Sequence, residues 1–303
     1  MKKITVLGSA VAKDECFGAT RRHDPCGGMF LAAETAARKQ LESAGIVFCS
    51  EAELPPEKAD GIFCLELDRE LRTRIHALPP ACGKVLQAMA PPFAPGISHH
   101  AADTFMDSVW ARIVTWNRAF AAEHLIVCDP PYSCEDISAV PAKIREFDPS
   151  ARGLAVLSRE PNEIRGLVLD KNRLCRTLAD CGEVEPAHIP DSPREALKLI
   201  SRYPFALVME DFWYAGFVSE VLVLCLMAGV PVIYWGDTAT AKQRFPGTFI
   251  PLEAHSVEAF RAAKEKLISR RAELKKDKDE IRQMSERWKE SYLAALGKAF
   301  ENV

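Results

Sequence analysis

Short apolar runs alternate with longer amphipathic stretches along the first half of the chain. Runs of this length and composition predict β-strands. The predicted strands are residues 3–8, 46–49, 61–67, 84–89, 109–115 and 125–128. The Ala-rich stretch 29–43 has helical periodicity and stops before Gly45, which predicts an amphipathic helix. Because strands that alternate with helices favour a parallel sheet, we predict a first α/β domain over residues 1–150.

The same alternation restarts beyond the proline-containing stretch 129–152, which we interpret as a linker. The predicted elements of this second part are a strand at 153–158, helices near 163–180 and at 192–201, a strand at 205–209, a helix at 217–228 and a strand at 230–235. They predict a second α/β domain over residues 151–256, and two such domains favour a ligand cleft between them.

The C-terminal stretch 257–303 is charge-rich and helical in period. Its apolar residues recur every seven positions, at Phe260, Leu267, Leu274, Ile281 and Trp288. One narrow stripe predicts a long helix that packs back against the body of the protein rather than a coiled-coil oligomer. A second interpretation stays open, in which a basic face of this extension docks on a membrane surface. The residues of that face are Arg270, Arg271, Lys275, Lys276 and Lys278.

Composition narrows the class of protein. The chain has 303 residues and a net charge of −3. The length favours two domains, and the charge gives no electrostatic footprint for nucleic acid. No apolar run approaches the roughly 20 residues of a membrane span, and the run after Met1 is too short for a signal peptide. We therefore expect a cytoplasmic protein with reduced thiols, and Cys16, His23 and Cys26 fit no common zinc spacing, so no metal site is predicted.

Residues 203–250 carry most of the chemistry in the sequence. Glu210 and Asp211 close an apolar run, and Glu220 lies in the first turn of the following helix. A parallel strand would deliver the acidic pair to the carboxyl edge of a sheet, where open parallel sheets bind ligands. Helix N-termini at that edge attract anions. The block therefore predicts a nucleotide-sugar pocket.

Four segments of this block carry a family resemblance. They are Met-Glu-Asp at 209–211, Phe-Val-Ser-Glu-Val at 217–221, Gly-Val-Pro-Val-Ile-Tyr-Trp-Gly at 229–236 and Pro-Gly-Thr-Phe-Ile at 246–250. Their order and spacing resemble those of the family-ten glycosyltransferases, the α-1,3/1,4-fucosyltransferases. A weaker likeness covers Ala-Arg-Ile-Val-Thr-Trp-Asn at 111–117 and Pro-Pro at 91–92. The chain resembles a divergent, bacterial-type member of that family.

The resemblance implies two Rossmann-like domains facing a cleft, the GT-B-like arrangement, followed here by the C-terminal helical extension. It implies an inverting transfer of a sugar, foremost fucose from GDP-fucose. The acceptor would be a hydroxyl of an oligosaccharide or of a cell-surface polysaccharide precursor, and no metal would be obligatory. By the same resemblance Arg165 contacts the diphosphate, Glu220 contacts the ribose, and Ser219 caps the helix or contacts a phosphate oxygen. The other residues implied are Asp211, Phe217 and Trp235 for the nucleotide sugar and Glu210 for catalysis.

Four positions depart from the family pattern. Val221 stands where relatives have Lys, and Asp211 stands where they have Asn. Phe217 replaces a Tyr, and Ala90 replaces the acidic general base. A general base contributes about 10²- to 10⁴-fold in rate, so an active enzyme needs a substitute.

Substitute bases are available near the predicted sheet edge of the first domain. His99 and His100 follow the proline-rich segment, and Glu66 and Asp68 end a predicted strand. Two alternatives to an ordinary fucosyltransferase stay open. One is a non-catalytic relative that binds a nucleotide or a glycan, and the other is a glycosyltransferase that uses a different nucleotide-sugar donor. Nothing in the pattern sets the acceptor, the linkage or the oligomeric state.

Overall fold

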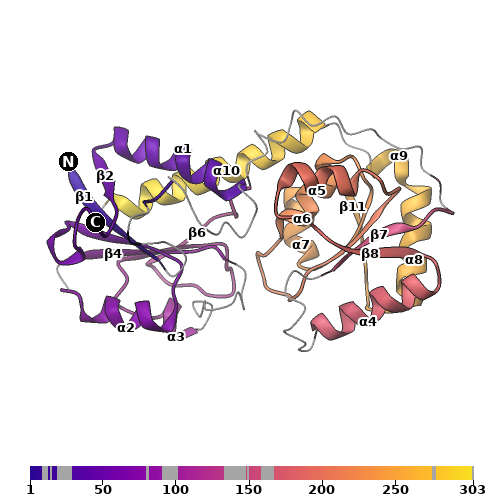
Figure 1. Ribbon diagram of the computed structural model, residues 1–303, viewed down its shortest axis with the longest axis horizontal. Coiled ribbons are helices and arrows are strands. Elements are labelled where there is room, and N and C mark those ends of the chain that lie inside the picture. The colour runs from indigo at the N-terminus through magenta and orange to yellow at the C-terminus, as the bar shows by residue number, and fades with distance from the viewer. Residues whose placement is uncertain are drawn as a thin grey trace. The chain divides into compact units, whose positions relative to one another are not determined.

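The computed structural model has two compact units (Figure 1). Unit 1 is Met1–Ser133 with Arg287–Val303, and unit 2 is Cys134–Glu286. The structure describes residues 1–8, 13, 16–18, 29–79, 82–90, 102–132, 148, 150–157, 167–274 and 278–301. Compact units need not coincide with folding domains, so the division of the chain at residues 150 and 256 stays a prediction.

Unit 1 contains a six-stranded parallel sheet in the order β2-β1-β3-β4-β5-β6. The strands are β1 (Lys2–Gly8), β2 (Ile46–Cys49), β3 (Gly61–Leu65), β4 (Gly83–Ala88), β5 (Arg112–Thr115) and β6 (Leu125–Val127). The helices of this part are α1 (Met29–Ser43), a 3-10 turn η1 (Pro56–Lys58), α2 (Arg69–Ala77) and α3 (Ala102–Phe105).

Both faces of this sheet are covered. Figure 1 shows α2 and α3 on one face, with α1 and the end of α10 (Lys278–Phe300) on the other. Successive residues of β3 alternate between these faces: Ile62 and Cys64 pack with Ile75 of α2, whereas the Phe63 ring lies 5.2 Å from the Phe300 ring. Unit 1 therefore needs residues from both ends of its sequence to complete its core.

Unit 2 contains a five-stranded parallel sheet in the order β11-β10-β9-β7-β8. The strands are β7 (Gly153–Leu157), β8 (Val184–His188), β9 (Ala206–Met209), β10 (Val232–Trp235) and β11 (Phe249–Pro251). The helices are α4 (Leu167–Asp180), α5 (Pro193–Ile200), α6 (Glu220–Met227), α7 (Thr238–Arg244), α8 (Val257–Ser269) and α9 (Arg271–Leu274). Together with unit 1, this sheet confirms the expected α/β class.

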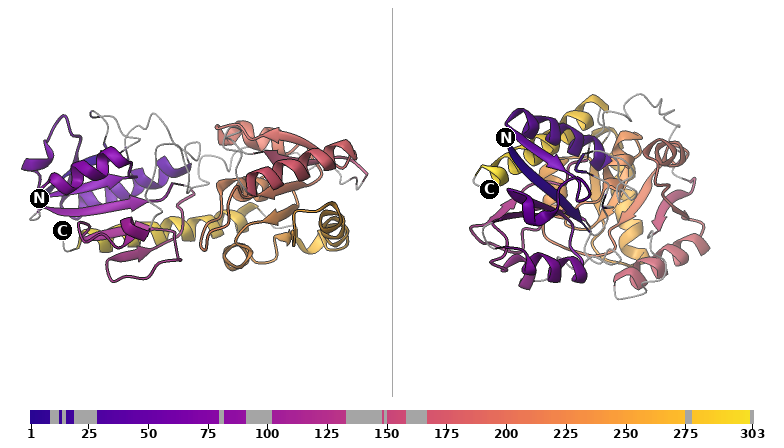
Figure 2. Two further views of the ribbon diagram at one scale, coloured as in Figure 1. Left: turned by 90° about the horizontal axis from the view of Figure 1, so that it is seen from below. Right: turned by 60° about the vertical axis from the view of Figure 1, so that its left-hand side comes forward.

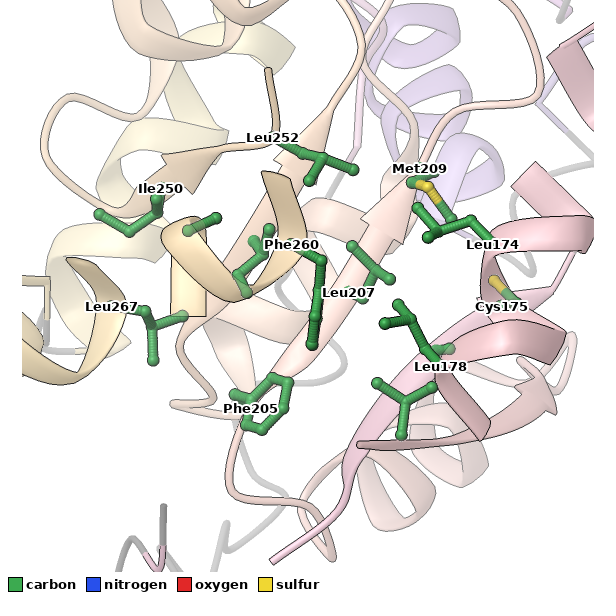
Figure 3. Close-up of a cluster of buried hydrophobic side chains, with 14 of the residues drawn as sticks. Leu174, Cys175, Leu178, Phe205, Leu207, Met209, Ile250, Leu252, Phe260 and Leu267 are labelled. Carbon is green, nitrogen blue, oxygen red and sulfur yellow. The ribbon is translucent and has the colours of Figure 1, made fainter. Parts of the chain in front are cut away.

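The core of unit 2 lies between β9 and two helices. Figure 3 shows Leu207 and Met209 of β9 and Phe205 just before it, with Leu174 of α4 on one side and Phe260 of α8 on the other. The opposite face of β9 and β10 is covered by α6, which is apolar along almost its whole length and buried. Because α6 is held on the sheet by this burial, its N-terminus is fixed at the carboxyl edge of the strands.

The C-terminal stripe is buried, as expected, but not on one helix. All five stripe residues are at most 4% exposed. The single long helix is wrong, because α8 ends at Ser269 and Arg270 leaves the helical conformation. The Ser269 hydroxyl donates to the Lys266 carbonyl, a bond that competes with the helical ladder. Docking of the basic face on a membrane stays a prediction, and no helix within the described ranges has the length and hydropathy to cross a bilayer. Figure 2 shows the helices and sheets from two further directions.

Candidate functional site

The polar residues of the second sheet gather where its parallel strands end. Glu210 and Asp211 directly follow β9, and Gly236 and Asp237 directly follow β10. Since β9 and β10 are paired in parallel, these residues lie at the same carboxyl edge. This is the edge at which the sequence pattern places the acidic pair.

Glu210 is buried and joins three elements. Its Oε1 accepts hydrogen bonds from the Ser219 amide at 2.9 Å and from the Tyr234 hydroxyl at 2.9 Å. Burial raises the pKa of Glu210 and these hydrogen bonds lower it only in part, so the pKa is raised to about 7. The carboxyl group therefore ties the end of β9 to β10 and to the start of α6.

Gly236 leaves room for that arrangement. A Cβ at this position would lie 2.5 Å from the Tyr234 hydroxyl and 2.6 Å from Cγ of Glu210. Any other residue would push the Tyr234 hydroxyl and the Glu210 side chain away from each other. The glycine of the Tyr-Trp-Gly segment is thus required by close approach.

The start of α6 carries Ser219 and Glu220. Ser219 occupies the N-cap position, but its side chain accepts no capping hydrogen bond. The expected capping role is therefore wrong: its hydroxyl, like its amide, bonds to Glu210 instead. Glu220 is the first residue of the helix and is buried, so its carboxylate lies close to the positive end of the helix dipole.

Asp211 forms an ion pair that the sequence does not indicate. The Lys171 Nζ lies 2.7 Å from Oδ1 of Asp211. Lys171 comes from α4, which follows β7, and β7 is the neighbour of β9 in the sheet. The Lys171 side chain is 3% exposed and that of Asp211 is 35% exposed. The negative charge that Asp211 adds to the edge is thus balanced from the protein interior.

Aromatic rings surround these groups. The Trp235 ring lies 4.4 Å from the His255 ring, and burial lowers the pKa of His255, which stays neutral near pH 7. The Nε2 atom of His255 is buried and has no hydrogen-bond partner. Phe217 is buried against Phe212 at 4.8 Å between ring centroids, whereas Trp213 is 54% exposed. The ring of Phe217 therefore packs inside the loop.

Asp237 fixes the same loop from the other side. Its carboxylate accepts from the Gly216 amide at 2.7 Å, and from the hydroxyl and amide of Thr240 at 2.6 and 3.2 Å. Burial would raise the pKa of Asp237, but these donors outweigh it and lower the pKa. Asp237 is the N-cap of α7, and the Asp-x-x-Thr spacing could have predicted this role.

The remaining sequence-predicted residues are split between described and undescribed parts of the chain. Arg165, His99 and His100 lie outside the described residues. Asp68 is the N-cap of α2 and accepts from the Leu71 amide at 2.7 Å. Glu66 is buried, has a left-handed backbone (φ 62°), and accepts from the amides of Met89 and Ala90 at 3.1 and 2.9 Å. Glu66 therefore connects the ends of β3 and β4, and Asp68 caps the start of α2.

The described residues give no support for a metal site. Within the described ranges no group of three or more His, Cys, Asp or Glu side chains could hold an ion.

Comparisons with known proteins bear on the fold. No family model matches the chain, and no curated protein matches it. A crystal structure of an α1,3-fucosyltransferase matches with a TM-score of 0.58 and 13% identity, over 99% of this chain and 90% of that chain. The structure of an α1,3-fucosyltransferase with GDP-fucose matches with a TM-score of 0.54 and 13% identity, over the same shares. TarM matches with a TM-score of 0.50 and 11% identity, over 80% of this chain and 56% of that chain.

At these identities the likeness is one of fold. The two parallel sheets with their helices form the two Rossmann-like parts of the GT-B fold, which the fucosyltransferase structures share over nearly the whole chain.

Proposed function

We propose that the protein is a glycosyltransferase that moves a sugar from a nucleotide-sugar donor to a hydroxyl of an acceptor. One observation carries the proposal. Glu210, Ser219 and Tyr234, which come from three of the fucosyltransferase-like segments, meet at the carboxyl edge of the second sheet around the Glu210 carboxyl group. Ligands of open parallel sheets bind at this edge.

The nucleotide-sugar donor would bind at this carboxyl edge of the second sheet. The first turn of α6 presents backbone amides and a positive dipole end, which suit a diphosphate. In the proposal Arg165 binds the diphosphate through its guanidinium, Glu220 binds the ribose hydroxyls, and Asp211, Phe217, Ser219 and Trp235 complete the site. No metal is proposed as obligatory, because Arg165 and the positive end of the α6 dipole would balance the charge of the leaving diphosphate. GDP-fucose is the donor that we favour, since fucosyltransferase structures with GDP and with GDP-fucose share the fold.

The reaction proposed is an inverting displacement. The acceptor hydroxyl attacks the anomeric carbon while the bond from that carbon to the diphosphate breaks, and the diphosphate leaves with the electron pair. A base removes the hydroxyl proton; His99 or His100 is proposed for that task. Glu210 belongs to the catalytic set by resemblance, and its bonds to Ser219 and Tyr234 favour a positioning role. The acceptor would be an oligosaccharide or a surface-glycan precursor, and a cytoplasmic location stays part of the proposal.

A non-catalytic relative is the second candidate. Ala90, which stands at the family's base position, is buried and offers no proton acceptor in its side chain. Val221, at the family's Lys position, offers no cation next to Glu220. Such a protein would bind a nucleotide sugar or a glycan without turning it over.

Nucleotide binding and turnover separate these candidates. GDP at a hundredfold excess over its dissociation constant should raise the free energy of unfolding by about 2.7 kcal/mol, which a thermal-shift measurement detects. Arg165→Ala should abolish the rise, whereas Arg173→Ala on the exposed part of α4 should leave it unchanged. Release of GDP from GDP-fucose should then require an oligosaccharide acceptor. Intact nucleotide binding with no release from any nucleotide sugar would leave only the non-catalytic candidate.

A further inference from the structure

The Lys171–Asp211 pair has an asymmetry that a surface ion pair lacks. The ammonium group is almost completely buried, while the carboxylate side chain remains about one-third exposed (35%) at the sheet edge. A buried ammonium group needs a charged or strongly polar partner, and Asp211 supplies one at 2.7 Å. What the pair offers to a ligand is therefore a carboxylate and not a cation.

Lys171 is thus a poor candidate for the diphosphate. A phosphate would have to displace Asp211 and reach an ammonium group with 3% exposure. Its charge acts instead on the groups around it, because it balances Asp211 and also helps to keep neighbouring His255 uncharged. With Asp211 balanced, a diphosphate can lie nearby without facing an unpaired negative charge.

The chemistry of an ionised carboxylate then selects the ligand group. An ionised Asp only accepts hydrogen bonds, and it can accept two side by side. At neutral pH a diphosphate offers no hydrogen-bond donors, whereas the donor sugar, the ribose and the base all do. The proposed function assigns the ribose, and with it the nucleoside, to Glu220, so the part of a nucleotide sugar left for Asp211 is the sugar.

We infer that the Lys171–Asp211 pair recognises the donor's sugar: Asp211 accepts hydrogen bonds from sugar hydroxyls, and Lys171 orients that carboxylate and balances its charge. This inference rests on the proposed function. Asp211 is then a donor-binding residue and Lys171 a positioning residue that acts through it. An amide side chain at residue 211 would present one acceptor and one donor, so the pair also makes the site stricter about the hydroxyl pattern that it accepts.

The test compares the dissociation constants of GDP and of a sugar nucleotide by calorimetry on the full chain. GDP-fucose, GDP-mannose and UDP-glucose are first titrated into the wild-type protein, and the tightest is kept together with its own nucleoside diphosphate. Asp211→Asn should change the dissociation constant of the nucleoside diphosphate less than about threefold and weaken the sugar nucleotide about tenfold or more. Asp180→Asn, at the far end of α4 from the sheet edge, is the control and should change neither.

Lys171 is tested in the same measurement. Lys171→Met should also weaken only the sugar nucleotide, and Lys171→Arg should restore part of the preference. Because Lys171→Met removes the ammonium group that balances Asp211, that variant can lose stability. The double variant Lys171→Met/Asp211→Asn removes both charges and so controls for this loss. If the two residues act together, the double variant should be no weaker than Asp211→Asn alone.

Three outcomes would overturn the inference. Equal weakening of both ligands by Asp211→Asn would assign Asp211 to the nucleoside diphosphate or to the fold, and no weakening would remove it from the site. A Lys171→Met variant that is less stable but keeps the wild-type ratio of dissociation constants would make Lys171 purely structural. Absence of nucleotide binding in the wild-type protein would instead overturn the proposed function, and this inference with it.

Discussion

At the scale of single residues, Glu210 shows how burial and hydrogen bonding compete at one carboxyl group. Its pKa, raised by burial to about 7 from 4.5, means that the folded protein holds a proton that the unfolded chain releases. The stability that this group contributes is fully present below pH 4.5 and is lost as the pH rises through about 7. The contribution of Glu210 to the free energy of unfolding should therefore be larger in acidic than in neutral solution.

Glu210→Gln tests this pH dependence. The introduced amide would keep an acceptor for Ser219 and Tyr234 but cannot ionise, so the wild-type protein should lose about 2–3 kcal/mol relative to the variant between about pH 5 and pH 8. Urea unfolding at both pH values measures the difference. Glu183→Gln is the matched control, because hydrogen bonding to Lys264 lowers the pKa of Glu183 and its effect should be constant over this range. A constant difference for Glu210→Gln as well would mean that the native carboxyl group is already ionised at the lower pH.

At the scale of elements, the glycine after β10 should matter more than a glycine in a helix. Gly236→Ala would place a methyl group 2.6 Å from Cγ of Glu210, so we expect a loss of about 2 kcal/mol or more and weaker nucleotide binding. Gly297→Ala, in α10, has no atom closer than 4.0 Å and should stabilise the helix by about 0.5–1 kcal/mol. Thermal unfolding of both variants, with and without GDP, measures this contrast. Equal stability of the two variants would show that the edge can relax around the added methyl group.

Most elements could be predicted because their apolar periodicity is strong. The strand expected at 205–209 appears as β9 (Ala206–Met209), and the helix expected at 192–201 appears as α5 (Pro193–Ile200). The helix expected at 217–228 begins later, at Glu220, because the segment before it is held by Asp237 and Glu210 rather than by a helical ladder. The start of α6 thus depends on local hydrogen bonds, which the pattern of apolar residues does not reveal.

Elements with weak apolar patterns were missed. Strand β8 (Val184–His188) contains Glu185 and Pro186, which are tolerated because β8 is the edge of its sheet. Helix α2 is mostly polar and buries little beyond Leu71 and Ile75. The Lys171–Asp211 pair could not be predicted either, since the two residues meet only because β7 and β9 are neighbours in the sheet.

At the scale of the whole molecule, the end of α10 is part of the core of unit 1. The Tyr292 hydroxyl donates to Oε1 of Gln87 in β4 at 2.6 Å, and the Gln87 amide donates to Glu34 of α1 at 2.9 Å. These three side chains are fully buried. The helix therefore contributes both apolar surface and a polar link to the first sheet.

Tyr292→Phe should expose the importance of that link. It leaves the buried Oε1 of Gln87 without this donor, so we expect a loss of about 1–3 kcal/mol in the free energy of unfolding. Tyr203→Phe removes a hydrogen bond to Glu185 at a partly exposed position in unit 2, where water can replace it, and should cost less than about 0.5 kcal/mol. Urea unfolding compares the two variants. Similar small losses in both would indicate that the Gln87 side chain turns to another partner.

The place of α10 in unit 1 has a consequence for biosynthesis. The face of the first sheet that carries Phe48 and Phe63 is closed by Phe300, and residues 134–286 must be translated before it. At about 5–20 residues per second the ribosome needs roughly eight to thirty seconds for that intervening stretch. During this time the nascent chain presents an apolar sheet face that its own C-terminal helix cannot yet cover, so we expect chaperones to engage it there. The first sheet to leave the ribosome is the last to be completed.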